Sequence, residues 1–313
     1  MGKSSKSKAK RDILLEDPMA EAGRKLLAVQ LDRMKRHEAG SRTGEDIESV
    51  HQMRVAIRRM RSLFMLTGAY YKTRTVNKYG HDLRRIARAL GRIRDLDVLI
   101  HDLEAFRPAL TAGDQAALDQ IIVGLDSRRS EHRAALNALF DSKFYARFLR
   151  QFARLCRKRG RGAAPVAKRE EPHQLRHVLP LLLHERLARV RAYDTVLPAS
   201  DDTILHALRV EFKQLRYALE FFRPLLGASS DNFLQEAKEI QEILGRINDI
   251  AVFSDYMSGL KKLNPEQAAV VQDYLADRDQ ALAALRLRFD KQWASFSSRA
   301  RLRQFSDALL VLR

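Results

Sequence analysis

Residues 51–61 read HQMRVAIRRMR, and this stretch predicts a helix with two distinct faces. At 100° per residue, the basic side chains of one face fall within an arc of about 80°. They are His51, Arg54, Arg58 and Arg61, here called the first basic stripe. A second face, about 100° away, has the apolar i, i+3, i+7 spacing that is typical of a buried helix. Apolar residues flank the basic stripe on both edges and no acidic residue interrupts it, which suggests the wall of a groove rather than an open surface.

The chain as a whole is strongly basic. Its 313 residues include 57 Lys and Arg against 39 Asp and Glu, a formal net charge of +18. This balance favours a polyanionic partner, namely nucleic acid, an anionic membrane or a phosphate polymer. Gly (14 residues) and Pro (8 residues) are scarce and long periodic segments dominate, so we expect an all-α fold. One cysteine, Cys156, excludes an intramolecular disulfide and a multi-cysteine metal site.

The amino-terminal segment is basic and polar. Residues 1–11 are rich in Lys and Ser, and no apolar segment follows them, so we expect no secretory signal here. No apolar run approaches the roughly 18 residues that a membrane-spanning helix needs. We therefore expect a cytoplasmic protein whose basic tail, residues 1–15, is disordered.

The basic helix returns later in the chain. At an offset of 155 residues, the positions of the first basic stripe are occupied by His206, Arg209, Lys213 and Arg216, the second basic stripe. Further along, LGRIRDLDV at residues 90–98 returns as LGRINDIAV at residues 244–252. This self-similarity indicates an internal duplication.

The helices that carry the LGRI segments add further charged positions. In the first copy one side holds Arg84, Arg88, Arg92 and Asp95, and in the second copy it holds Lys238, Glu242, Arg246 and Asp249. Because Glu242 reverses the charge of Arg88, the predicted site contains the other basic positions only. Asp95 and Asp249 are suited to orient a basic side chain through a charge-assisted hydrogen bond.

A glycine interrupts each of these helices. Gly91 and Gly245 lie in mid-helix, where glycine costs about 1 kcal/mol relative to alanine. The compensation that we expect is the close approach of a neighbouring helix.

The periodicity divides the chain into segments. Residues 158–173 contain Gly, Pro and clustered charges, and we expect a basic linker there between two helical bundles, residues 16–157 and 174–313. Residues 38–44, which contain two glycines, predict a loop. A break at Asp141–Ser142 precedes a short helix with the sequence FYARFLRQFARLCRKR.

Four segments, VHQMRVAIRRMR, LGRIRDLDV, LHALRVEFKQLRYALEFF and LGRINDIAV, resemble in this order the CHAD family, the conserved-histidine α-helical domain. The resemblance implies an all-α fold of two four-helix bundles, related by a pseudo-twofold, with a basic cavity or channel between them. It also implies binding of inorganic polyphosphate, and with it an association with polyphosphate granules. The chain lacks the strand-rich pattern of the triphosphatase domain that some family members carry.

Carried over by position, the resemblance implies a set of polyphosphate-binding residues. They are His51, Arg54, Arg58, Arg61, Arg84, Arg92, His206, Arg209, Lys213, Arg216, Lys238 and Arg246. The two copies differ at Gln214, which stands where the first copy has Arg59, and at Glu242. The two halves therefore need not bind equally.

The leading hypothesis is non-catalytic binding of polyphosphate. Arg side chains bind phosphate oxygens bidentately, and a phosphate polymer has no bases to stack on aromatic rings. The basic stripes contain no aromatic residue apart from Tyr217 at one edge, whereas binders of single-stranded nucleic acid usually interleave aromatic and basic residues. The alternative is a basic helical protein that binds nucleic acid, although no nucleic-acid-binding motif is present. We expect nucleic-acid binding to be weak or non-specific, and no binding to membranes.

An enzyme is a third class. The pairs His81–Asp82 and His101–Asp102 are similar to metal ligands of some phosphohydrolases. Both lie on one predicted helix about 30 Å apart, so they cannot share a metal ion, and the second copy has no equivalent pair. Cys156 has no evident base partner. We therefore expect no catalytic residue, no metal site and no cofactor.

Overall fold

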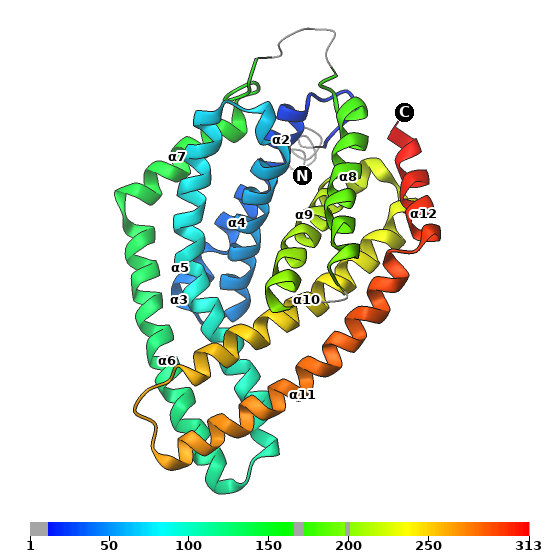
Figure 1. Ribbon diagram of the computed structural model, residues 1–313. Helices are drawn as coiled ribbons and strands as arrows, with labels where there is room; N and C mark the ends of the chain where they lie inside the picture. The colour runs from blue at the N-terminus through cyan, green and yellow to red at the C-terminus, as the bar shows by residue number, and fades with distance from the viewer. Residues whose placement is uncertain (1–11, 166–171, 198–200, 313) are drawn as a thin grey trace. The chain divides into compact units, whose positions relative to one another are not determined.

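The computed structural model describes residues 12–165, 172–197 and 201–312, and these residues form an all-α protein (Figure 1). Its helices are α2 (Met19–Arg36), α3 (Glu38–Thr43), α4 (Ile47–Thr67), α5 (Thr73–Phe106), α6 (Ala112–Asp141), α7 (Lys143–Arg157), α8 (Leu175–Arg191), α9 (Asp202–Leu226), α10 (Asp231–Ser258), α11 (Pro265–Phe296) and α12 (Arg299–Leu309). The described ranges contain no β-strand, only isolated bridges at Pro18–Gln174 and Tyr71–Ala163. The predicted fold class is confirmed.

The chain forms two compact units that alternate along the sequence. Unit 1 holds the chain up to Asp97 together with Arg128–Leu182, and unit 2 holds Val98–Ser127 together with Leu183–Val311. The long helices α5 and α6 each contribute residues to both units. The sequence repeat predicts two contiguous segments instead, residues 16–157 and 174–313. That these segments are the two copies of a duplication, and that each forms a four-helix bundle, remains a prediction.

In unit 1, α4 is fixed by its cap and by its apolar face. The Asp46 carboxylate accepts a hydrogen bond from the backbone N–H of Glu48 at 2.8 Å, which satisfies one of the free amides at the start of the helix. Met53, Ile57 and Met60 are fully buried, as their spacing predicts. Because α4 buries this face against α2, the basic stripe lies on another side of the same helix.

Two predictions about unit 1 need correction. Residues 38–43, predicted as a loop, form the short helix α3, which ends where Gly44 adopts a left-handed conformation with φ of 75°. Glycine adopts this conformation without strain, so here it terminates a helix instead of preventing one. Residues 12–15, predicted as part of the tail, contact unit 1: Ile13 is buried, and Lys25 donates a hydrogen bond to the carbonyl of Asp12 at 2.8 Å. Residues 1–11 lie outside the described part of the chain.

The described parts of the predicted linker also belong to unit 1. The Gly162 carbonyl accepts a hydrogen bond from the N–H of Lys72 at 2.8 Å, and the His173 carbonyl accepts one from Met19 at 3.0 Å. Residues 158–165 and 172–173 are not helical, as predicted. Residues 166–171 lie outside the described ranges.

Unit 2 is built on α9, α10 and α11, which pack against one another (Figure 1). Its core is aromatic, with Phe212, Phe222 and Phe296 fully buried. Helix α11 begins with a capping box, in which Asn264 and Gln267 exchange hydrogen bonds between side chain and backbone at 2.7 and 3.1 Å. No helix among the described residues is long and apolar enough to cross a bilayer.

Candidate functional site

The first basic stripe lies on α4 in unit 1. His51, Arg54 and Arg58 are half-buried and Arg61 is exposed. Burial lowers the pKa of His51, and the positive charges of Arg94, Arg58 and Arg54 lower it further, against the opposing effect of Glu48. The stripe therefore holds a neutral imidazole among permanent cations near neutral pH.

One carboxylate enters this region. Asp95 of α5 forms an ion pair with Arg54 of α4, with 3.3 Å between Nη1 and Oδ1. The prediction that Asp95 engages a basic side chain is confirmed for this copy. Asp249, the equivalent residue of unit 2, also has an interaction partner. Both members of the Arg54–Asp95 pair are substantially exposed, so the pair orients Arg54 more than it stabilises the fold.

A cluster of like charges lies between α4 and α5. The pKa of Arg61 is lowered, first by partial burial and then by the positive charges of Arg84 and Arg88. Arg84 and Arg88 are thus close enough to repel Arg61. We call Arg61, Arg84 and Arg88 the arginine cluster.

The structure adds two residues to the predicted set in unit 1. Arg88 is absent from that set because Glu242 replaces it in the second copy, yet it belongs to the arginine cluster. Arg94 is also absent, although its charge acts on His51. The signal for Arg94 is its position in LGRIRDLDV, where the second copy has Asn248. Arg92, which was predicted, is exposed on α5.

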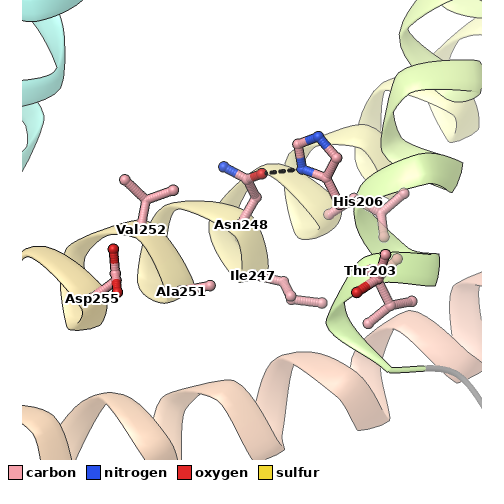
Figure 2. A pocket seen from close by; sticks show the side chains of 9 residues that line it. Thr203, His206, Ile247, Asn248, Ala251, Val252 and Asp255 are labelled. Atoms are coloured by element: carbon pink, nitrogen blue, oxygen red, sulfur yellow. Dashed lines mark hydrogen bonds between the residues drawn. The ribbon is translucent and has the colours of Figure 1, made fainter.

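The second basic stripe lies on α9 in unit 2. His206 is exposed, and Arg209, Lys213 and Arg216 are half-buried. The Nδ1–H of His206 donates a hydrogen bond to Oδ1 of Asn248 on α10 at 2.7 Å (Figure 2). This contact occupies Nδ1 and leaves Nε2 as the ring atom that can contact a ligand.

Arg216 differs from its counterpart Arg61. Its guanidinium group forms an ion pair with Glu220, one turn further along α9, and donates a hydrogen bond to Gln241. It also stacks 4.6 Å from the ring centroid of Tyr217. A carboxylate thus already neutralises Arg216, whereas the cluster in unit 1 contains cations only.

The other predicted cations of unit 2 lie on α10. Lys238 is half-buried and Arg246 is exposed. The pKa of Asp231 is lowered, mainly by its hydrogen bond from Arg223 and to a smaller extent by Lys238. Lys238 therefore also has a carboxylate in its surroundings.

A pocket borders the second stripe. It has a volume of about 420 Å³ and lies between residues of α9 and α10, with His206 and Asn248 at one side and Asp255 at another (Figure 2). Ile247, Ala251 and Val252 provide its apolar wall. Aliphatic groups and a carboxylate do not attract phosphate, so His206 stands at the edge of a basic face and not at the bottom of an anion pocket.

The two mid-helix glycines are not explained by helix packing, and that prediction is wrong. A Cβ atom added to Gly245 would meet no described atom within 4 Å, and one added to Gly91 would meet only the Asp95 carboxylate, at 3.9 Å. At 100° per residue, Gly91 lies within about 20° of Arg84 on the helix. Each glycine therefore lies on the basic side of its helix, and no described helix packs closely against it.

The histidine–aspartate pairs have structural surroundings. Asp102 accepts hydrogen bonds from the hydroxyl of Tyr274 at 2.7 Å and from Nη1 of Arg278 at 2.9 and 3.0 Å. These bonds join the end of α5 to α11 within unit 2. His81 is largely exposed, with its Nδ1 3.7 Å from Asp82.

Comparison with known proteins gives consistent results. A family model for the CHAD domain matches residues 25–258. Two Mycobacterium tuberculosis proteins, MT2285 and Rv2226, are each 28% identical to the chain over 220 residues, covering 67% of this chain and 40% of theirs. The chain thus spans about two fifths of the length of these curated relatives.

Two solved structures share the fold. The crystal structure of the CHAD domain from the plant Ricinus communis matches with a TM-score of 0.73 and 24% identity, covering 93% of this chain and 96% of that one. PptA from Streptomyces chartreusis matches with a TM-score of 0.69 and 17% identity, covering 89% of this chain and all of that one. At these identities the similarity establishes the fold alone.

Proposed function

The chain belongs to the CHAD domain family, and from this premise we propose that it binds inorganic polyphosphate through its basic stripes without acting on it chemically. The observation that carries the proposal is the arginine cluster of unit 1. The positive charges of Arg84 and Arg88 act on Arg61 and, after its partial loss of hydration, lower its pKa further. A phosphate group among them would replace repulsion by charge-assisted hydrogen bonds.

The surroundings of the cluster suit a phosphate chain more than a nucleic acid. Arg54, held by Asp95, and the half-buried Arg58 extend the row of donors along α4. Tyr217, the aromatic residue at the edge of the second stripe, is buried, so it offers no face on which a base could stack. An unbranched polymer of phosphates needs only such donors.

Three of the described groups with side chains suited to catalysis are engaged or buried. Asp95 is paired with Arg54, and Asp102 is held by Tyr274 and Arg278. Cys156 is buried. A binding role without catalysis agrees with these surroundings. The proposal extends to a cytoplasmic protein that associates with polyphosphate granules.

Calorimetric titration with polyphosphates of several chain lengths tests the proposal. We expect binding whose affinity falls steeply with salt, by a slope of about 0.7 per neutralised phosphate on a double logarithmic plot. Competition with DNA and RNA of equal total charge provides the control. Equal affinity for polyphosphate and nucleic acid at moderate salt would favour the nucleic-acid-binding alternative and contradict the proposal.

A further inference from the structure

Helix α7 carries a separate line of cations in unit 1. At intervals of three or four residues it presents Lys143, Arg147, Arg150, Arg154 and Arg157, here called the α7 stripe. At 100° per residue these side chains fall within an arc of about 80°. All five are exposed, whereas Tyr145, Phe148 and Phe152 on the opposite face are buried in the core of unit 1.

The α7 stripe is not neutralised by carboxylates. No acidic residue occurs between positions 142 and 169 of the sequence. Asp141, which precedes the helix, is already paired with Arg42, at 2.7 Å between Oδ1 and Nη1. Within the described ranges, no member of the stripe forms an ion pair, and the side-chain contact of Arg157 is to the Ala153 carbonyl of its own helix. Five like charges along one helix face are unfavourable unless a polyanion contacts them.

Contacts between α5 and α7 connect this stripe with the arginine cluster. The Arg85 guanidinium lies 4.1 Å from the ring centroid of Phe144 on α7, and Lys78 donates a hydrogen bond to Gln151. Arg85 directly follows Arg84 of the arginine cluster in the sequence. Exposed cations of α5 thus lie both on the side of the arginine cluster, at Arg84 and Arg88, and on the side of α7, at Arg85.

We propose that the α7 stripe is a second contact surface for long polyphosphate chains, which extend to it from the first basic stripe. This inference rests on the proposed function and adds a dependence on chain length. The stripe covers about 21 Å, since its 14 residue steps each rise 1.5 Å, and forms a single row that suits a flexible single chain. Its members are all Lys or Arg, so it has no aromatic platform for bases. Its apolar face is occupied by the core, so α7 cannot insert into a bilayer as interfacial helices do.

The two surfaces then act on one polymer. Once phosphates occupy the first basic stripe, the rest of a long chain is held near α7 at a high effective concentration. Tripolyphosphate is too short to gain from the second surface. The affinity for long chains should therefore depend on α7, and the affinity for tripolyphosphate should not.

The test is a triple substitution of exposed residues, Arg147→Gln, Arg150→Gln and Arg154→Gln. Glutamine is a good helix former, so α7 should be retained, and circular dichroism checks this. We expect the affinity for long-chain polyphosphate to fall about tenfold, a factor of about two for each exposed charge. The salt slope should decrease by about 2, since each lost contact removes about 0.7. The affinity for tripolyphosphate should stay unchanged.

A second triple variant is the matched control. Arg107→Gln, Arg189→Gln and Arg223→Gln remove the same charge from unit 2, at positions that pair with Asp119, Glu185 and Asp231. Little change in long-chain affinity is expected from it. Equal losses in both triple variants would overturn the proposal, because net charge alone would then explain binding.

Other outcomes also decide the question. A loss for tripolyphosphate as large as that for long chains would overturn the proposal, because α7 would then act only through the first site. A larger loss for duplex DNA than for polyphosphate would assign the stripe to nucleic acid instead. Unchanged long-chain binding in the α7 variant would refute the second contact surface and leave the proposed function intact. Absence of polyphosphate binding in the unsubstituted protein would refute both the second contact surface and the proposed function.

Discussion

His206 and Asn248 are joined across α9 and α10 by a hydrogen bond of 2.7 Å, and their counterparts His51 and Arg94 also influence one another in unit 1. Arg94 of α5 and Asn248 of α10 occupy equivalent positions, and each lies near the histidine of its own copy. In one copy it holds a neutral amide and in the other a permanent cation. The duplication therefore keeps a polar residue at this position near the histidine while changing its charge.

The first prediction concerns protonation of His51. Its pKa is lowered in the free protein by burial and by Arg94, and a bound phosphate would raise it again. Binding of polyphosphate should take up protons between about pH 6 and 8, and affinity should increase as the pH falls through this range. Calorimetry in buffers of different ionisation enthalpy measures the uptake. His51→Gln should remove most of it, and zero uptake in the unsubstituted protein would rule out contact between His51 and phosphate.

The stability of the ligand-free protein should have the opposite pH dependence at His51. Because the folded-state pKa lies below the unfolded value near 6.5, the unfolded chain binds this proton more readily. His51 should thus reduce stability as the pH falls below about 6.5. Urea unfolding at several pH values, compared with His51→Gln, checks this contribution. A variant with the same pH dependence as the parent would contradict it.

The second prediction separates the stripe from general charge. Arg54→Ala, Arg58→Ala and Arg209→Ala should each weaken polyphosphate binding by about 1–3 kcal/mol, the range for losing a hydrogen bond to a charged group. Arg59 lies on α4 about 120° from the centre of the stripe, so Arg59→Gln, which introduces the residue of the second copy, should have a much smaller effect. Affinities at one salt concentration provide the comparison. Equal losses at all four positions would mean that no organised site exists.

The third prediction uses the difference between Arg61 and Arg216. Arg61 faces other cations, whereas Arg216 is paired with Glu220, so Arg61→Gln should reduce polyphosphate affinity more than Arg216→Gln. The order should reverse for stability, because Arg216→Gln leaves the poorly exposed Glu220 carboxylate without its ion pair. Titration and urea unfolding of both variants measure the two effects. If Arg216→Gln weakens binding as much as Arg61→Gln, the pairing in unit 2 does not limit phosphate binding.

Periodicity in the sequence was enough to predict the helical fold and the two faces of α4. The buried Met53 and Ile57 follow directly from the i, i+3, i+7 pattern. The Arg216–Glu220 pair is predictable from its i, i+4 spacing, although Glu220 lies beyond the end of the basic stripe. The roles of Arg88 and Arg94 required the packing of α4 against α5, because comparing the two copies emphasises shared residues and hides those in which the copies differ.

The glycines show another limit of sequence reasoning. A mid-helix glycine indicates that space is needed at that position, but it does not say what uses the space. Around Gly91 and Gly245, no described helix takes it. Because both positions lie on the basic sides of α5 and α10, an explanation that can be tested is a ligand that approaches the backbone closely.

The last prediction tests this explanation. Gly91→Ala and Gly245→Ala should each stabilise the free protein by up to about 1 kcal/mol, because alanine favours the helix and its Cβ meets open space. Each substitution should nevertheless weaken polyphosphate binding, since the added methyl group would occupy the surface along which the phosphate polymer is expected to lie. Gly124→Ala is the matched control: Gly124 is exposed in α6, its added Cβ would meet nothing within 4 Å, as at Gly245, and it lies outside the basic stripes.

Thermal unfolding and titration of the three variants decide the matter. A stabilisation shared by all three variants, with weaker binding only in Gly91→Ala and Gly245→Ala, would assign the glycines to ligand access. If all three variants bind as tightly as the parent, the phosphate chain does not approach the backbone here. The Gly–Arg pairs Gly91–Arg92 and Gly245–Arg246 would then be explained by the internal duplication alone, and not by ligand binding.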